Sequence, residues 1–210
     1  METDQELLIN GLNELGIKPA NAVIRHFILY LHELKKWNRA YSLTAINDNR
    51  DIIIKHFMDS LLYLKAIPEG LWSICDVGSG AGFPGLPMAI VRPDISVTLV
   101  EPSRKKTAFL KHMKRTLSLS NVVVIVSRVE DVKDSTFDIA VTRALFSIGD
   151  FIKKAGPILK EGGFLVLNKG PKFEEEIKDL PAHTHTRYEI IPVSLPLTAL
   201  QRSLIKVSID

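Results

Sequence analysis

The sequence is poor in cysteine and in long apolar runs. Its single cysteine, Cys75, excludes a disulfide framework within the chain of 210 residues and favours a reducing compartment. No apolar run approaches the length of a membrane span, and residues 1–6 carry acids where a signal peptide would carry basic residues. These absences predict a cytoplasmic protein without a membrane partner.

The sequence also lacks the residue patterns of metal sites and of catalytic nucleophiles. No group of His, Cys, Asp and Glu residues has the spacing of metal ligands, and no Ser or Cys is accompanied by a suitably spaced base. We therefore expect no metal cofactor and no covalent intermediate on a side chain.

The composition supports a globular protein. With 46% hydrophobic residues, a chain of this length can bury a full core, and the length suits one α/β domain with a modest extension. The net charge of +3 is only mildly basic. A polyanionic partner is therefore compatible with the sequence only if the positive charge is concentrated on one surface.

The hydrophobic pattern changes partway along the chain. Residues 3–65 have helical periodicity, whereas from Trp72 onward short β-rich runs alternate with helical ones. The predicted strands are 72–77, 95–100, 121–127, 137–142, 163–168, 187–193 and 203–209, with a charged helix over 173–180 before the last two. This pattern predicts an α/β fold with a seven-stranded, mainly parallel sheet whose last two strands pair antiparallel at one edge. We place a helical extension in residues 1–68, packed on a sheet domain of residues 69–210.

A glycine-rich segment follows the first predicted strand. Gly78, Gly80, Gly82 and Gly85 lie within eight residues, directly after an apolar run that ends at Val77. Such glycines allow backbone angles that side chains forbid, and they let a ligand lie against the main chain where a strand meets a helix. We call residues 78–85 the glycine turn and predict that it binds a nucleotide-like cofactor. A turn without a ligand is the simpler alternative, but it would not need so many glycines.

Two motifs fit the glycine turn. The dinucleotide pattern G-x-G-x-x-G fits residues 80–85, but it begins late after the strand, and Pro84 and Pro87 interrupt the helix that should begin at once. The pattern D-x-G-x-G-x-G fits residues 76–82 and begins at the strand end. This second spacing is typical of methyltransferases that use S-adenosyl-L-methionine, so we predict that cofactor.

Polar residues follow the next predicted strands, at the edge of the sheet where ligands bind. Glu101 ends the second strand, where a carboxylate can accept hydrogen bonds from ribose hydroxyls; the alternative is an acid at the start of a helix. Val129 and Glu130 follow the third strand and can border an adenine. Arg143 ends the fourth strand and can face the site, although a surface salt bridge is an equal alternative.

The helix expected after Glu101 has two different faces. At 100° per residue its apolar residues gather on one side and basic residues on the other. The basic residues are Arg104, Lys105, Lys106, Lys111, Lys114 and Arg115, with no acid among them. Such a surface can bind the phosphates of a nucleic acid. A solvated helix face is the alternative.

These motifs together resemble the bacterial 16S ribosomal RNA guanine-N7 methyltransferase G family. The matching segments, in the family's order, are 37–38 with 43–46, 56 with 59–61, 76–85, 128–130, 137–138, 143–144 and 169–170. The glycine turn alone indicates a methyltransferase, and its Phe83-Pro84-Gly85 half is more specific to this family. One departure is Glu101-Pro102-Ser103, where the family usually has an aspartate followed directly by serine.

The resemblance implies a fold and a set of site residues. The fold would be the Rossmann-like class I fold of methyltransferases dependent on S-adenosyl-L-methionine, with 69–210 as the methyltransferase domain. Cofactor contacts are expected at Gly78, Phe83, Val129, Glu130 and Arg143, in addition to the turn glycines and the ribose-binding acid predicted above. Phe83 would pack on the cofactor, and Arg143 would lie near its methionine end or the incoming base.

The resemblance also implies the substrate. The acceptor would be N7 of a guanine in 16S rRNA, guanine 527 in rRNA numbering, presented as RNA or as the small ribosomal subunit. Lys169 is a further candidate for an RNA phosphate, whereas His56, Trp37 and Asn38 more often serve packing than catalysis. A monomer is expected.

The expected reaction makes few chemical demands. N7 of guanine has an in-plane lone pair and no proton, so no general base is needed and the task is to align the nucleophile and exclude water. We therefore name no catalytic acid or base and treat Arg143 as a positioning candidate. The alternatives are a methyltransferase of another substrate and a non-catalytic binding protein that retains a vestigial turn.

Overall fold

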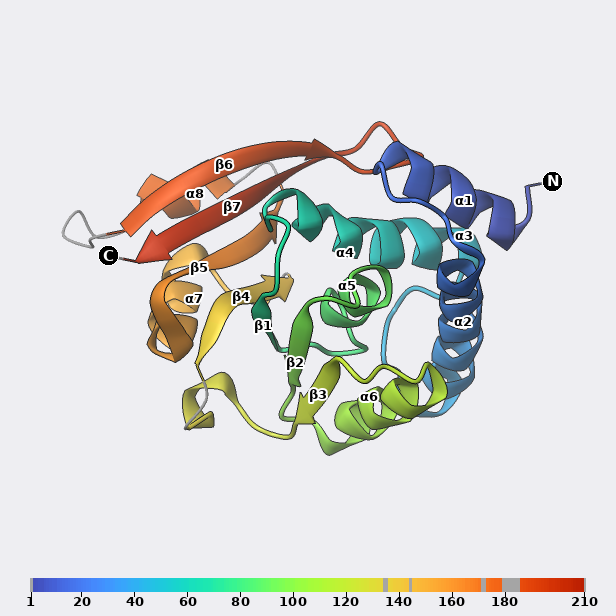
Figure 1. Cartoon of the computed structure of the whole chain (residues 1–210), viewed down its shortest axis with the longest axis horizontal. Helices are drawn as coiled ribbons and strands as arrows, with labels where there is room; N and C mark the ends of the chain where they lie inside the picture. The colour runs from blue at the N-terminus through green and yellow to red at the C-terminus, as the bar shows by residue number, and fades with distance from the viewer. Residues whose placement is uncertain (1, 134–135, 144, 171–172, 179–185, 210) are drawn as a thin grey trace.

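The computed structural model describes residues 2–133, 136–143, 145–170, 173–178 and 186–209. Its centre is a seven-stranded sheet with the order β3-β2-β1-β4-β5-β7-β6 (Figure 1). The strands are β1 (Ser73–Val77), β2 (Ser96–Val100), β3 (Val122–Ile125), β4 (Phe137–Arg143), β5 (Leu159–Lys169), β6 (Thr186–Ser194) and β7 (Gln201–Ile209). The first five strands pair in parallel, and β7 pairs antiparallel with both β5 and β6. The predicted topology is confirmed.

The fifth strand is the main difference from the predicted boundaries, because it begins at Leu159 rather than at residue 163. The sequence there contains Gly162 and Gly163, which normally indicate a turn. In the structure Gly162 has a φ of 74°, and the pairing of β5 with β4 changes register between Phe137 and Ile139. The strand therefore continues through an irregularity of the kind that a sequence pattern does not distinguish from a loop.

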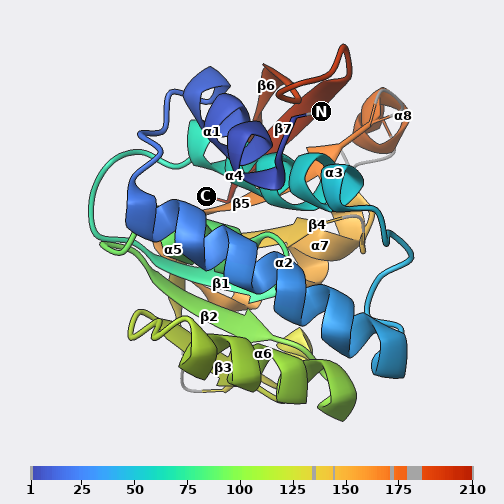
Figure 2. The same cartoon turned by 90° about the vertical axis from the view of Figure 1, so that its right-hand side faces the viewer.

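Helices flank the sheet on both faces (Figure 2). Before β1 come α1 (Asp4–Glu14), α2 (Asn21–Tyr41), α3 (Asn49–Ile52), the π-helical turn η1 (Ile53–Met58), α4 (Asp59–Leu61) and η2 (Leu62–Lys65). After it come α5 (Gly85–Val91), α6 (Arg104–Thr116), η3 (Val129–Asp131), α7 (Ile148–Ala155), η4 (Gly156–Ile158) and α8 (Phe173–Lys178). Among the helices that the structure describes, none combines the length and the hydropathy needed to cross a bilayer. The predicted helix over 173–180 is described as far as Lys178.

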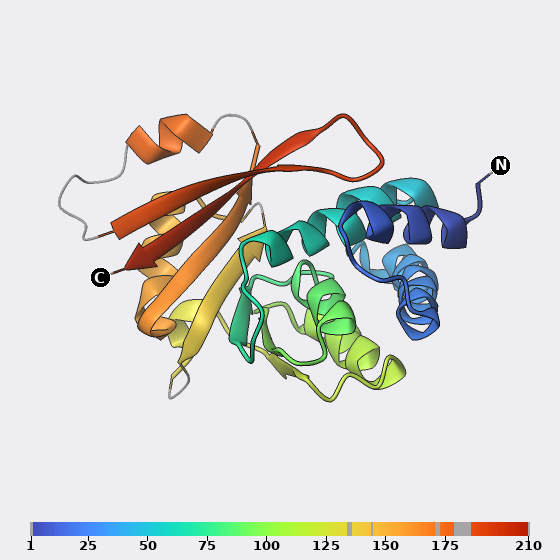
Figure 3. The ribbon, with the colours of Figure 1, turned by 45° about the horizontal axis from the view of Figure 1, so that its top comes forward.

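Two apolar cores hold these layers together. The larger core joins α1, α2, η1, α4, α5 and α6 to one face of the sheet, whereas the smaller one joins α7 and η4 to the other face. In α2, the fully buried Phe27, Tyr30, Leu31 and Leu34 recur at helical spacing, which explains why this helix lies along the sheet domain. Figure 3 shows the N-terminal helices beside α5 and α6. The division into residues 1–68 and 69–210 stays a prediction.

Candidate active site

The glycine turn begins where β1 ends. Gly78, Gly80 and Gly82 have φ values of 72°, 58° and 99°, a region that side chains rarely adopt. The Gly78 amide donates to the carbonyl of Val100 over 2.8 Å, which ties the turn to the end of β2. The next helix, α5, begins only at Gly85. The turn thus has the register of the motif that starts at the strand end, rather than the register of the dinucleotide pattern.

Asp76 supports the turn from below. Its side chain is fully buried, and Oδ2 accepts a hydrogen bond of 2.9 Å from the amide of Gly85 at the start of α5. A Cβ atom on Gly85 would lie 2.7 Å from that same oxygen, so the contact requires glycine. Oδ1 has no hydrogen-bond partner among the described residues. Burial raises the pKa of Asp76 to about 7, although the bond from Gly85 opposes the shift.

Glu101 supports the turn from the side. Its carboxylate is buried, and Oε2 accepts from the amide of Gly80 over 2.9 Å while Oε1 accepts from the amide of Ser103 over the same distance. Ser103 in turn caps α6. The acid thus joins the turn to the start of the basic helix. Each carboxylate oxygen can accept a second hydrogen bond, so the ribose contact predicted for Glu101 stays a prediction.

A cavity of about 230 Å³ opens beside the turn, at the carboxyl ends of β1 and β2. Its wall includes Gly78, Val100, Val129 and Phe146, which make much of it apolar, and Glu130 lies at its rim. Glu130 forms an ion pair with Lys154, and this hydrogen bond lowers its pKa. Three of the predicted cofactor residues, Gly78, Val129 and Glu130, thus surround one cavity of a size that suits part of a small ligand.

Phe83 is buried in the larger core. It is 4% exposed, stacks on Tyr30 with ring centroids 5.5 Å apart, and stacks on His56 at 4.5 Å. The guanidinium of Arg143 lies 4.8 Å from its ring centroid. The ring therefore belongs to the larger core and carries a cation–π contact. Its predicted packing on the cofactor stays a prediction.

Arg143 is held by the helix before β1. Its Nη1 donates to Nδ1 of His56 over 3.1 Å and to the carbonyl of Lys55 over 3.2 Å. Burial and the nearby charge of Arg143 lower the pKa of His56 to about 4, so this ring is neutral. Nδ1 of His56 lies 3.2 Å from the carbonyl of Lys55 as well. Because the Arg143 guanidinium can only donate, we assign Nδ1 as its acceptor and place the ring proton on Nε2, which then donates to Oγ1 of Thr44 over 2.8 Å.

Thr44 links this contact to the segments that suggested the family. Asn38 accepts a hydrogen bond of 2.8 Å from the amide of Thr44 and donates one of 2.9 Å to its carbonyl. Trp37 packs against the larger core beside Phe109. These contacts fit the packing role expected for Trp37 and Asn38, and Thr44 connects Asn38 to His56.

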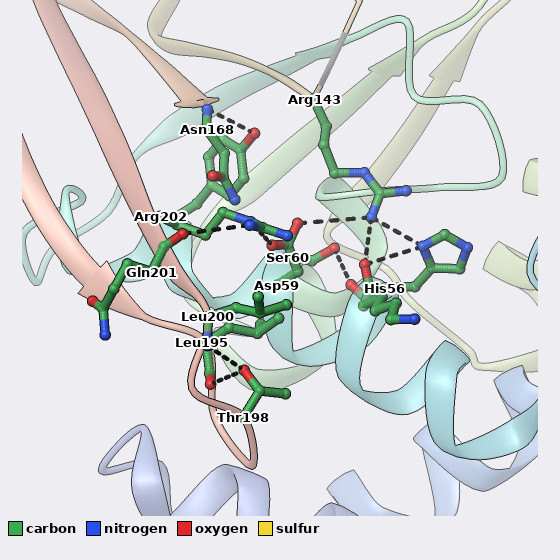
Figure 4. A network of polar contacts seen from close by, with 12 residues as sticks. His56, Asp59, Ser60, Arg143, Asn168, Leu195, Thr198, Leu200, Gln201 and Arg202 are labelled. Atoms are coloured by element: carbon green, nitrogen blue, oxygen red, sulfur yellow. Dashed lines mark hydrogen bonds and ion pairs between the residues drawn. The ribbon is translucent and has the colours of Figure 1, made fainter. Parts of the chain in front are cut away.

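Asp59 was recognised in the sequence only as part of a matching segment, but it lies at the centre of a charged network (Figure 4). Its Oδ1 lies 3.2 Å from Nε of Arg202, and its Oδ2 lies 4.0 Å from Nη1 of Arg143. Burial raises its pKa, and the two arginines oppose that shift. The π-helical turn η1, a conformation found often at functional sites, precedes Asp59 directly.

Arg143, Asn168 and Arg202 form what we call the polar row. Arg143 on β4 is the register partner of Asn168 on β5, and Asn168 is the partner of Leu204 on β7, two residues after Arg202. Register partners point to the same face of a sheet, as do residues two apart on a strand. Neither Asn168 nor Arg202 lies in a motif, so the sequence offered no signal for them.

The predicted RNA-binding residues fall into two groups. Arg104, Lys105, Lys111 and Arg115 are exposed on α6, and their apolar counterparts on that helix are buried, so the predicted division of its faces is confirmed. Lys169 differs, because its side chain is 13% exposed and its ammonium group donates to Glu176 and to a backbone carbonyl. Its phosphate contact stays a prediction. Ala144, part of a matching segment in the sequence, lies outside the described residues.

Comparison with known proteins identifies the family. A family model described as rRNA small subunit methyltransferase G (GidB) matches residues 23–205. The chain belongs to this family. The Ribosomal RNA small subunit methyltransferase G of Neisseria meningitidis is 40% identical over 177 residues, which are 84% of this chain and 85% of the relative. That of Bordetella pertussis is 38% identical over 197 residues, which are 89% and 86% of the two chains.

A solved structure of a methyltransferase from Pyrococcus furiosus shares the fold, with a TM-score of 0.59 at 16% identity and coverage of 84% of this chain and 94% of that one. The predicted family and the class I methyltransferase fold are thereby confirmed, and the chain is an enzyme of the methyl-transfer class.

Proposed function

We propose that the chain transfers the methyl group of S-adenosyl-L-methionine to N7 of a guanine in 16S rRNA, at position 527 as the family resemblance implies. The observation that carries the proposal is the glycine turn beside the strand-end cavity, in a chain of this family. We infer a cytoplasmic reaction on the RNA or on the small ribosomal subunit, by a monomer.

The residues present fit the cofactor. The cavity beside Gly78 suits the adenosine part of the cofactor, with Val129 and Glu130 next to the adenine. Glu101 lies close enough to the turn to accept hydrogen bonds from the ribose hydroxyls. A Cβ atom on Gly78 would lie 2.2 Å from Leu145 on the wall of the cavity, so glycine at this position keeps that side of the cavity open for a ligand. When bound, the cofactor supplies a methyl group on a sulfonium, which is activated for transfer.

The surrounding residues then have geometric tasks. N7 already offers its lone pair, so no side chain needs to remove a proton. His56 agrees with this, since Nδ1 accepts from Arg143 and Nε2 is bonded to Thr44. Arg143, fixed at one edge by His56 and by Phe83, retains Nε and Nη2 without partners among the described residues, and these can orient the methionine end or the base.

The basic face of α6 supports an RNA substrate. It begins next to Glu101, at the carboxyl edge of the sheet, and its exposed cations can neutralise phosphates beside the site. Reversing the charges of Lys111 and Arg115 together should weaken binding of the RNA. It should also lower the slope of log K against log salt by the amount expected for the loss of about two phosphate contacts. Reversal of Lys153, exposed on α7, is the matched control. An unaltered slope in the double variant would make α6 an ordinary solvated face.

The direct test uses small-subunit particles from cells that lack this protein. Incubation with labelled cofactor should place the label on one guanine N7, at the position implied by the resemblance. Label on another atom or base, or on ribosomal protein, would contradict the proposal.

A further inference from the structure

The polar row extends away from the glycine turn along the carboxyl edge of the sheet. β4 lies next to β1, and β5 and β7 follow in order, so Arg143 lies nearest the turn and Asn168 and Arg202 lie beyond it. Asp59 faces the row from the helical segment opposite (Figure 4). A ligand that meets a cofactor held by the turn would therefore lie over the outer part of the row.

Asn168 has hydrogen-bonding capacity that the described residues do not use. The residue is 9% exposed, yet neither the nitrogen nor the oxygen of its amide has a hydrogen-bond partner among them. The amide lies close enough to Asp59 to lower the pKa of that carboxyl, but without the geometry of a hydrogen bond. Burying an unpaired amide is costly, so such a group calls for an explanation. A donor and an acceptor side by side on a planar amide match the edge of a purine.

Arg202 has a similar unused edge. Its Nε bonds to Asp59 and its Nη1 lies 3.4 Å from the carbonyl of Gln201, whereas Nη2 has no partner among the described residues. The side chain is 28% exposed. Asp59 thus fixes one edge of the guanidinium and leaves the other toward solvent. Two arginines that share one carboxylate also carry a net positive charge, which suits a phosphate.

We propose that Asn168 and Arg202 form the acceptor subsite for the target nucleotide, and that Asp59 is the positioning residue that holds Arg202 there. The proposal rests on the proposed function. N7 must face the methyl group, which leaves the edge with O6 and N1–H for Asn168: its Nδ2 donates to O6, and its Oδ1 accepts from N1–H. Arg202 binds a phosphate of the same nucleotide or of its neighbour.

The first test replaces Asn168 by leucine, which has the same branched shape and number of side-chain heavy atoms but no polar atoms. If the amide serves the substrate, Asn168→Leu should lower kcat/KM for small subunits by about tenfold, the value of one or two neutral hydrogen bonds. The melting temperature should stay the same or rise, because an unpaired buried amide has been removed. A lower melting temperature with unchanged kcat/KM per folded molecule would make Asn168 structural and overturn its role.

The second test uses Arg202→Gln and Arg202→Lys. Loss of a charge-assisted contact should raise KM for the RNA by about tenfold to a hundredfold in Arg202→Gln. Arg202→Lys should restore only part of it, because lysine lacks the planar fork. Calorimetry should give an unchanged Kd for S-adenosyl-L-methionine in both. Lys153→Gln, which also removes one positive charge, should leave KM near the wild-type value.

The outcomes separate this inference from the proposed function. If wild-type protein does not methylate the RNA, the proposed function fails. If wild-type protein is active and Arg202→Gln matches Lys153→Gln in KM, the acceptor subsite is wrong while the function stands. If Arg202→Gln loses cofactor affinity as well, Arg202 belongs to the cofactor site and the assignment is overturned.

Discussion

Two neighbouring parts of one sheet edge are built in different ways. Around the glycine turn, at the ends of β1 and β2, Glu101 and Asp76 accept hydrogen bonds from main-chain amides, and the cavity beside them is largely apolar. Around the polar row, at the carboxyl ends of β4 and β5 and the start of β7, charged side chains meet one another, and the side-chain amide of Asn168 has no partner among the described residues. We call the first part, the glycine turn with Asp76 and Glu101, the cradle, because main-chain groups shape it. The second part is a set of charged and polar side chains that retain unused hydrogen-bonding groups. A rigid cradle suits a constant cofactor, and spare hydrogen-bonding groups suit an incoming acceptor.

The largest effect is expected in the cradle. A Cβ on Gly82 would meet Leu86 at 2.4 Å and the Tyr30 hydroxyl at 2.7 Å, at a φ of 99°. Gly82→Ala should lower the free energy of unfolding by about 3 kcal/mol or more and abolish measurable cofactor binding. Gly162→Ala is the control, since its φ is 74° but nothing lies within 4 Å. Urea unfolding and calorimetry measure both effects. Equal cofactor affinity in the two variants would show that the turn does not form the cradle.

A smaller effect is expected at the centre of the charged network. Asp59→Asn leaves Arg143 and Arg202 without their shared carboxylate, which should lower the free energy of unfolding by about 2–3 kcal/mol, because both arginines keep some contact with water. Asp51→Asn breaks an exposed pair with Lys55 and should cost about 0–1 kcal/mol. If urea unfolding shows equal losses in both variants, Asp59 does not hold the network together.

The buried acid of the cradle should make stability depend on pH. The folded pKa of Asp76 is about 7 against an ordinary value of 3.8, so between these values the folded chain binds a proton that the unfolded chain has lost. This contribution is complete below about pH 4 and is lost as the pH rises through 7. Relative to Asp76→Asn, wild-type protein should therefore lose roughly 2–3 kcal/mol between pH 5 and pH 8. Parallel unfolding curves at the two pH values would contradict the raised pKa.

The histidine beside Arg143 should produce a smaller change of opposite sign. The folded pKa of His56 is about 4, below its ordinary value of 6.5, so the unfolded chain binds the extra proton in that window. Stability from this group is present above pH 6.5 and is lost as the pH falls toward 4. His56→Gln should remove about 2 kcal/mol of this loss at pH 5. An identical loss in both proteins would mean that His56 is charged when folded.

The two parts also differ in how far the sequence reveals them. The cradle depends on local spacing: an acid, three glycines and the next strand's Glu101 follow one another within a short stretch, so motif and register are enough to predict it. The polar row and Asp59, which faces it, come from distant segments of the chain. The pairing of β5 with β4 and with β7, together with the end of the π-helical turn, brings them together, and no spacing in the sequence encodes that contact.

The structure also gives two side chains partners that the sequence motifs do not indicate. A glycine-turn phenylalanine beside a cofactor motif favours a ligand contact, but Phe83 lies between Tyr30 and His56 in the core. A lysine after a buried strand favours a phosphate, but Lys169 is paired with Glu176. In both cases a partner on another element contacts the side chain, Tyr30 on α2 for Phe83 and Glu176 on α8 for Lys169, and a residue type at one position does not disclose such a partner.

The division of the edge into cofactor and acceptor parts is tested most directly by measuring two constants in the Arg202→Gln protein. These are the calorimetric Kd for S-adenosyl-L-methionine and the steady-state KM for small-subunit particles. We expect an unchanged Kd and a KM raised by at least about tenfold. A raised Kd, or an unchanged KM, would contradict this division of the edge.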